Sequence, residues 1–165
     1  MTRQTGILAD GAIRALFAAG RLKSEAALDI DQVQPASLDL RLGSKAYRVR
    51  ASFMPGPGHL VADKLARLKL HEIDLADGAV LETGCVYIVP LMESLDLPAE
   101  MSASANPKSS TGRLDIFTRV MTDRAQEFDK IPAGYNGPLY LEISPRTFPI
   151  VVRRGSRLSQ IRFRI

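Results

Sequence analysis

The sequence contains one cysteine, two histidines and no tryptophan among its 165 residues. A single Cys85 excludes an internal disulfide and a cysteine-rich zinc site. His59 and His71 are not spaced as ligands on one helix, and His71-Glu72 lacks the second histidine of a zinc-protease motif. The cysteine motif of zinc deaminases is also missing. Any hydrolytic chemistry is therefore expected to use carboxylates, serine, lysine and arginine, without zinc.

Long apolar runs and runs of like charge are absent too. The longest apolar segment, Cys85 to Met92, is interrupted by Pro90 and is far shorter than the ~20 residues of a membrane helix. Residues 1–17 lack the apolar block of a secretion signal. No block of five like charges occurs, and only ten residues are Phe or Tyr, which disfavours nucleic-acid binding. These absences predict a cytoplasmic protein that binds neither membranes nor nucleic acids.

The overall composition is typical of one folded domain. Apolar residues make up 45% and charged residues 24% of the chain. The 22 Lys and Arg residues exceed the 18 Asp and Glu residues by 4. That excess suits an anionic ligand, although surface lysines kept for solubility would give the same number. Residues 1–165 are expected to form a single domain.

Helical patterns occur early in the chain, and strand patterns dominate after residue 70. The first helix is expected to have Asp10 as its N-cap, Ile13 and Leu16 on its apolar face, and Gly20 as its stop. A second short helix is expected over 61–68. Later apolar segments alternate with turns, which predicts a mainly β fold, a sandwich, jelly roll or barrel.

Two segments combine polar residues in a way that permits a binding role. In VQPASLDLRLG (33–43), Asp39 and Arg41 lie opposite the leucines, and the spacing favours a solvated strand face with a surface ion pair. In NPKSSTGR (106–113), hydroxyls, a glycine and two cations occur within a few residues. Such a loop suits a phosphate chain, but an ordinary polar turn followed by a helix has the same composition.

Two further segments permit a role in chemistry. IPAGYNG (131–137) has turn chemistry, and predicts either a hairpin connection or a loop that closes on a base or sugar. Glu142 interrupts an apolar strand, on the face away from Leu139, Leu141 and Ile143. A carboxylate there is solvated, paired or used for proton transfer. The alternation alone favours an exposed strand glutamate.

Read in order, these segments resemble the dCTP deaminase branch of the dUTPase-like trimeric nucleotide hydrolases. VQPASLDLRLG resembles the first motif of that family, and PKSSTGR resembles its G-R-S-S-x-x-R motif. IPAGYNGPLYLEIS resembles the I-D-P-G-[WY]-x-G…LE motif, and GSRLSQIRF resembles the closing G-x-x-[IL]-x-Q-x-x-F strand. ILADGAIRALFAAGRL resembles the N-terminal helix of the family. The resemblance spans about residues 7–163.

The resemblance implies a distorted jelly roll or β-barrel with one N-terminal helix and short helical turns, assembled as a homotrimer with active sites between subunits. The implied reaction is deamination of dCTP to dUTP and ammonia without zinc, with Mg²⁺ arriving on the triphosphate. Glu142 would be the general base and acid, and Arg113 and Ser109 would hold the water and the developing charge. The implied substrate-binding residues are Lys108, Ser109, Ser110, Arg113, Thr122 and Tyr135.

Four departures from the family pattern leave alternatives open. Lys108 replaces an arginine, and Pro132 replaces the aspartate that contacts the sugar, unless Asp123 or Asp129 substitutes for it. About six extra residues lie near 124–129. The chain is also expected to lack the C-terminal tail that folds over the nucleotide. A dUTP diphosphatase, a bifunctional enzyme, a non-catalytic trimeric nucleotide-binding domain and an unrelated β-domain therefore remain alternatives.

Overall fold

The computed structural model describes residues 5–165. The prediction that residues 1–17 lack a secretion signal therefore concerns four residues that lie outside the described range. Three helices occur in this range: α1 (Asp10–Ala18), α2 (Val61–Leu68) and α3 (Ser109–Arg113). The strands are β1 (Leu22–Ser24), β2 (Val33–Gln34), β3 (Ser37–Leu40), β4 (Lys45–Val49), β5 (Lys69–Asp74), β6 (Ala79–Leu81), β7 (Val86–Asp96), β8 (Ser102–Pro107), β9 (Ile116–Thr122), β10 (Lys130–Ile131), β11 (Asn136–Pro145), β12 (Ile150–Val152) and β13 (Ser159–Arg164). The predicted mainly β fold with an N-terminal helix is confirmed.

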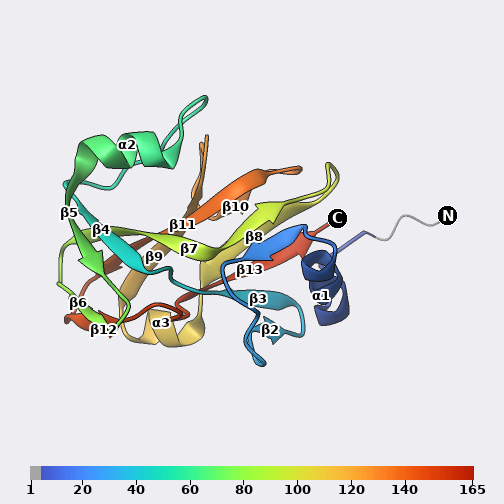
Figure 1. Cartoon of the computed structure of the whole chain (residues 1–165), viewed down its shortest axis with the longest axis horizontal. Coiled ribbons are helices and arrows are strands. Elements are labelled where there is room, and N and C mark those ends of the chain that lie inside the picture. The colour runs from blue at the N-terminus through green and yellow to red at the C-terminus, as the bar shows by residue number, and fades with distance from the viewer. Residues whose placement is uncertain (1–4) are drawn as a thin grey trace.

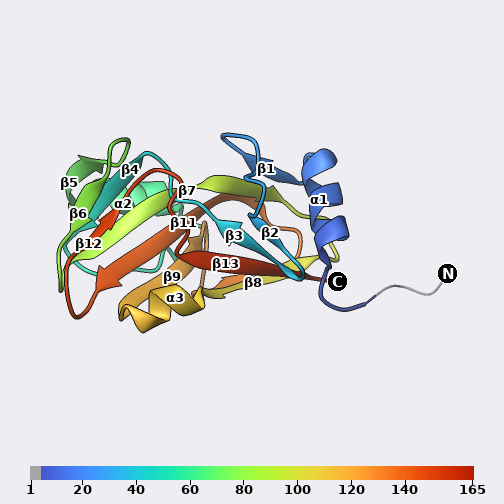
Figure 2. The same cartoon turned by 90° about the horizontal axis from the view of Figure 1, so that it is seen from below.

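Two large sheets and one small sheet make up the distorted jelly roll (Figure 1). The first large sheet has the order β5-β4-β7-β11-β9, with β1 added along β7. The second has the order β10-β8-β13-β3-β2, and β12 pairs with β6 in the small sheet. All of these pairings are antiparallel. Figure 2 shows α1 at one end of the sheets and the small sheet at the other.

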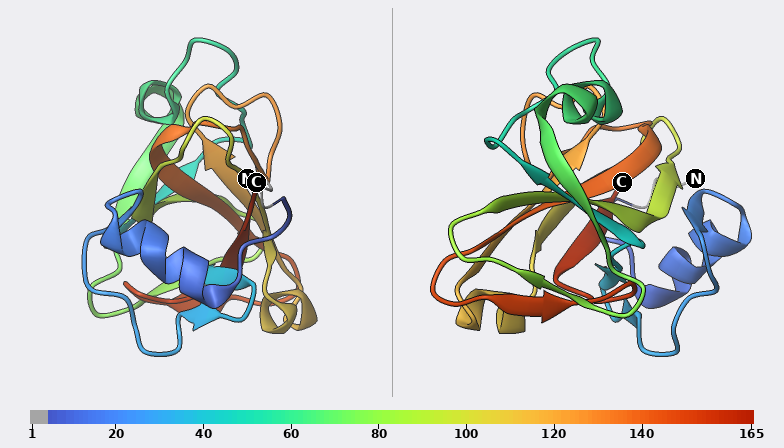
Figure 3. Two further views of the ribbon diagram at one scale, coloured as in Figure 1. Left: turned by 90° about the vertical axis from the view of Figure 1, so that its right-hand side faces the viewer. Right: turned by 60° about the vertical axis from the view of Figure 1, so that its left-hand side comes forward.

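Two apolar clusters cover opposite faces of the first sheet. The main core includes Leu141 and Ile143 of β11 together with Phe163 of β13, all nearly inaccessible to solvent. A second cluster lies on the other face, beneath α2, and consists of Val49, Val61, Leu65, Ile88, Met121 and Tyr140. Figure 3 shows α2 lying across this sheet, away from α1 and α3. β11 is therefore buried on both faces, which accounts for its apolar composition.

Both predicted helices form, with one correction at the start of α1. Asp10 is the first helical residue, and the N-cap is Ala9, whose side chain makes no capping bond. Asp10 still places a negative charge in the first turn, where the helix dipole favours it. Gly20 ends the helix as predicted, with φ of +72°. α2 begins and ends at the predicted residues, Val61 and Leu68.

The central strand β7 is longer than its sequence indicates. The apolar run stops at Pro90 in the sequence, but the strand continues through Pro90 to Asp96. Pro90 donates no amide hydrogen bond, but its carbonyl accepts a 2.9 Å bond from Gly43 N, and β11 shifts register nearby, between Pro138 and Tyr140.

The prediction of a solvated face on β3 is wrong. Asp39 is 1% exposed and Arg41 is 3% exposed, so both charges lie inside the protein. Both charges have partners that no local pattern reveals. Lys108 and Arg157 pair with Asp39, and Ser24 of β1 and Glu93 of β7 contact Arg41.

Candidate functional site

Glu142 is buried in the middle of β11, where it is 1% exposed, so the expectation of an exposed strand glutamate is wrong. It lies opposite Ile88 of β7 on one side and opposite Arg119 of β9 on the other. Tyr140 and Met121, close by on the same two strands, belong to the cluster beneath α2. The carboxylate thus lies on the face that α2 and the neighbouring loops cover.

Two polar side chains contact the Glu142 carboxylate. Arg119 Nε donates a 2.8 Å hydrogen bond to Glu142 Oε2. Ser52 Oγ donates a short hydrogen bond to Glu142 Oε1, and Arg119 Nη2 donates to Ser52 Oγ at 2.8 Å. These three bonds close a ring. Arg119 and Ser52 therefore partner the buried charge, which would otherwise be strongly unfavourable.

Aromatic rings hold the Arg119 guanidinium in place. Its central carbon lies 3.7 Å from the centroid of the Phe128 ring and 4.9 Å from that of Phe117. Stacking of this kind suits a planar guanidinium, and lysine would not reproduce it. The side chain of Arg119 is 29% exposed, so solvent reaches one side of the ion pair.

Two loops lie beside Glu142 and are bonded to each other. The Pro/Gly-rich loop 51–60 carries Ser52, and the loop 123–129 carries Phe128. Gly56 N donates to Ala125 O, and Arg124 N donates to His59 O, both at 2.9 Å. Asp123 Oδ1 also accepts a 2.9 Å bond from Val61 N at the start of α2. The segment 124–129, which the sequence marks as extra, is thus part of the cover over this face.

The predicted residues Thr122 and Tyr135 lie together in a cavity of about 660 Å³. Asp123, Pro132 and Arg124 line the same cavity. Asp129 faces elsewhere, since its Oδ1 accepts a 2.8 Å bond from Val120 N, and burial raises the pKa of its carboxyl. Of the two carboxylates expected to substitute for the missing aspartate, Asp123 is the one in the cavity.

Tyr135 braces the wall of this cavity through its hydroxyl. The hydroxyl donates to Pro138 O at 2.6 Å and accepts from Asp123 N at 3.0 Å. Burial raises the pKa of the Tyr135 hydroxyl, so it stays protonated and keeps donating near neutral pH. The 131–137 segment contains the predicted turn, but the hairpin connection is wrong, because β10 pairs with β8 whereas β11 pairs with β7 and β9.

The predicted phosphate-binding residues lie on a different part of the molecule. Ser109, Ser110 and Arg113 are exposed on α3, a single helical turn that begins at the polar segment. In Figures 1 and 3, α3 lies on the side of the molecule opposite α2. Within residues 5–165, the side-chain hydrogen bonds of Glu142 go to Ser52 and Arg119, and none goes to Ser109 or Arg113.

Lys108 and Ser109 line a smaller cavity of about 350 Å³ together with Asp39 and Gln160. Lys108 Nζ forms a short ion pair with Asp39 Oδ2, and Arg157 Nη1 lies 3.5 Å from the same oxygen. Asp39 Oδ1 is buried and has no hydrogen-bond partner in the described part of the chain. Lys108 thus reaches this cavity already paired with a buried carboxylate.

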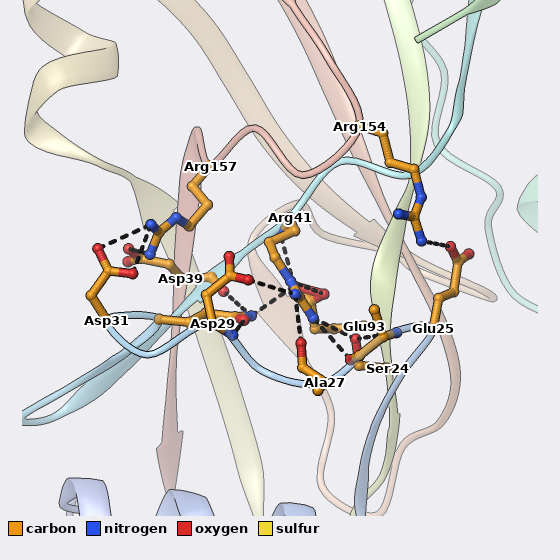
Figure 4. A network of polar contacts seen from close by, with 12 residues as sticks. Ser24, Glu25, Ala27, Asp29, Asp31, Asp39, Arg41, Glu93, Arg154 and Arg157 are labelled. Carbon is orange, nitrogen blue, oxygen red and sulfur yellow. Dashed lines mark hydrogen bonds and ion pairs between the residues drawn. The ribbon is translucent and has the colours of Figure 1, made fainter. Parts of the chain in front are cut away.

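A second buried ion pair lies near this cavity (Figure 4). Arg41 Nε is 3.5 Å from Glu93 Oε2, and Arg41 N donates to Glu93 Oε1 at 2.6 Å. The guanidinium also donates to Ala27 O at 2.9 Å and to Ser24 Oγ at 2.6 Å. Burial raises the pKa of Glu93 to about 7, although Arg41 opposes the shift. This network ties the segment after β1 to the core.

The sequence interpretation missed Ser52, Arg119 and Glu93. Arg119 had a detectable signal, because it is a cation within the apolar strand segment 116–122, as Glu142 is an anion within its own. Glu93 likewise follows an apolar run. Ser52 had no signal, since its loop is irregular and only the fold brings it to Glu142.

The described residues hold no group of three or more His, Cys, Asp and Glu side chains placed to bind one metal ion. No helix between residues 5 and 165 has the length and apolar character needed to cross a membrane.

Comparison with known proteins identifies the family. Residues 4–165 match the family model described as the 2'-deoxycytidine 5'-triphosphate deaminase (DCD) N-terminal domain, and the chain belongs to this family. A dCTP deaminase from Halorubrum lacusprofundi is 31% identical over 161 residues, which cover 95% of this chain and 76% of that protein. A "dCTP deaminase, dUMP-forming" from Beutenbergia cavernae is 29% identical over 158 residues, which cover 95% and 78%.

A solved structure is more similar still. The crystal structure of 2'-deoxycytidine 5'-triphosphate deaminase from Agrobacterium tumefaciens is 88% identical, with a TM-score of 0.97. The match covers 99% of this chain and 49% of that chain. This chain therefore spans about half the length of that enzyme.

Proposed function

We propose that this protein catalyses the zinc-independent hydrolytic deamination of dCTP to dUTP and ammonia, with Glu142 as general base and acid. One observation carries the proposal: in a chain of this family, Glu142 is buried on a strand and bonded to a fixed arginine. A buried carboxylate is unfavourable unless it is paired, and a paired carboxylate that keeps free lone pairs can accept a proton from water.

The chemistry requires one proton acceptor that becomes a proton donor. Glu142 takes a proton from water as the water oxygen bonds to C4 of cytosine. Glu142 then gives this proton to N3 of the base, takes the proton of the new C4 hydroxyl and passes it to N4, so that the C4–N4 bond breaks, ammonia leaves and C4 becomes a carbonyl. Each Glu142 oxygen has one protein donor, so each retains a lone pair for this exchange.

The cavity beside Thr122 is proposed to hold the nucleoside. Thr122 would lie beside the base, and Tyr135 would support the cavity wall through its bonds to Pro138 and Asp123. Asp123 is proposed to contact the sugar in place of the family aspartate. Its Oδ1 already accepts from Val61 N, so the contact falls to Oδ2.

The polar segment around α3 is proposed to bind the triphosphate with its Mg²⁺. Lys108, Ser109, Ser110 and Arg113 offer positive charge and hydroxyl groups there. α3 and α2 lie on opposite sides of the folded chain (Figures 1 and 3). We therefore propose that each active site lies between subunits of a homotrimer, where Arg113 and Ser109 of one copy face Glu142 of another. A nucleotide substrate and a single cysteine suit a cytoplasmic protein.

Two alternatives predict different products. A bifunctional enzyme would release dUMP and pyrophosphate; the Beutenbergia relative is named "dCTP deaminase, dUMP-forming". A non-catalytic nucleotide-binding domain would release nothing.

Chromatography of the nucleotides after incubation with dCTP and Mg²⁺ tests the proposal. We expect dUTP and ammonia from the native protein and none from a folded Glu142→Gln variant. Glu72→Gln is the matched control, because Glu72 is on the surface and pairs only with exposed lysines. Equal turnover by Glu142→Gln and the native protein would refute the role of Glu142, and dCTP binding without any product would favour the binding domain.

A further inference from the structure

The ring of Ser52, Arg119 and Glu142 is more than an isolated ion pair. Arg119 uses two different nitrogens, with Nε on Glu142 Oε2 and Nη2 on Ser52 Oγ, both at 2.8 Å. Ser52 passes a hydrogen bond on to Glu142 Oε1. The carboxylate is therefore held at both oxygens, which fixes its plane as well as its position.

Arg119 is held independently of Glu142. Its guanidinium lies against Phe128 at 3.7 Å and Phe117 at 4.9 Å. A side chain fixed by its own packing can orient another group without losing its own order.

The pairing of β9 with β11 does not depend on the ion pair between Arg119 and Glu142. β9 and β11 are paired continuously from Leu139↔Thr122 to Pro145↔Ile116 through their backbones. Arg119 is thus not needed to bring these strands together, and its bonds to Glu142 and Ser52 call for another explanation.

We infer that Arg119 is a positioning residue that holds the Glu142 carboxylate, with Ser52, in the orientation that accepts a proton from water. The inference rests on the proposed function. Ser52 is the outer member of the ring, since it lies on an exposed loop while Glu142 is buried. Loss of the arginine leaves only the Ser52 bond on Oε1, so the plane of the carboxylate is no longer held at both oxygens.

Arg119→Gln and Arg146→Gln form a matched pair for the test. Arg146 is exposed and also stacks on the Phe117 ring, at 5.1 Å, but it has no hydrogen bond or ion pair with Glu142. We expect Arg119→Gln to lower kcat for dCTP by about 10–100-fold and to change KM by less than about threefold. Arg119→Lys retains the charge on a single nitrogen, without the planar guanidinium, and is expected to recover part of kcat. Arg146→Gln is expected to match the native protein.

A second readout does not depend on turnover. In protein with ¹³C-labelled glutamate carboxyl groups, the Glu142 resonance is identified by its absence in Glu142→Gln. Arg119→Gln is expected to shift this resonance, and Arg146→Gln to leave it unchanged. An unmoved resonance, or a moved resonance with native kcat, would overturn the inference. If Arg119→Gln shifts the resonance but the native protein does not convert dCTP, the result would support the contact of Arg119 with Glu142 and refute the proposed deamination.

Discussion

Arg119 of β9 lies directly opposite Glu142 of β11, and its Nε donates a 2.8 Å hydrogen bond to Glu142 Oε2. The two charges therefore occupy one row of one sheet, with Ile88 of β7 next in the row. A site built on neighbouring strands is set by backbone pairing, so its geometry is fixed more tightly than that of a loop. The loop 51–60 adds Ser52, and this loop and the loop 123–129 cover the same face of the sheet.

Ser52→Ala is expected to lower the free energy of unfolding by about 1 kcal/mol, because it removes one donor from Glu142 and one acceptor from Arg119. Urea denaturation measures the change. Ser44→Ala is the control, since Ser44 is exposed on a turn. Equal midpoints for Ser52→Ala and Ser44→Ala would contradict the ring as a stabilising contact.

Lys108→Ala is expected to raise KM for dCTP by about tenfold through loss of a phosphate contact. It also leaves buried Asp39 with only Arg157 Nη1 at 3.5 Å, so the free energy of unfolding is expected to fall by about 1–3 kcal/mol. Steady-state kinetics and urea denaturation measure the two effects separately. Lys23→Ala removes an exposed charge of the same sign, and a KM change as large as that of Lys108→Ala would show only a general effect of charge.

Glu93 is expected to make stability fall as pH rises from about 5 to 7.5. Burial raises its pKa in the folded protein to about 7, from the ordinary glutamate value of 4.5, so the folded state binds the proton more tightly than the unfolded state. The stabilisation is complete below the unfolded pKa and is lost as pH passes through 7. The full pKa shift of Glu93 corresponds to about 3 kcal/mol in the free energy of unfolding. Urea denaturation at several pH values should show this decline in the native protein and a flatter profile in Glu93→Gln, and parallel profiles would contradict it.

Gly137→Ala is expected to disturb the cavity beside Thr122. An added Cβ would lie 2.7 Å from the Tyr135 hydroxyl, which two hydrogen bonds hold in place. We expect a loss of about 1–3 kcal/mol in the free energy of unfolding and weaker nucleotide binding by calorimetry. Gly11→Ala is the control, because its Cβ would meet nothing within 4 Å and α1 should gain about 0.5–1 kcal/mol. Unchanged binding in Gly137→Ala would place the nucleoside elsewhere.

The sequence by itself determined most of the elements and the candidate chemistry. Apolar periodicity located α1, α2 and the later strands, and glycine turns marked their ends, because these signals depend on residues close in the chain. The order of the four motifs also indicated the family, which the comparisons confirm. Glu142 was singled out because a carboxylate is unusual within an apolar strand.

Only the tertiary structure decided what surrounds these residues. Alternation shows that Glu142 and Asp39 face away from the leucines, but it does not show whether water or protein lies there, and both proved to be buried. The partners of Glu142 are far apart in sequence: Ser52 is 90 residues from it, and Arg119 is 67 residues from Ser52. No local pattern encodes such a contact, because the antiparallel pairing of β9 with β11 and the path of loop 51–60 create it.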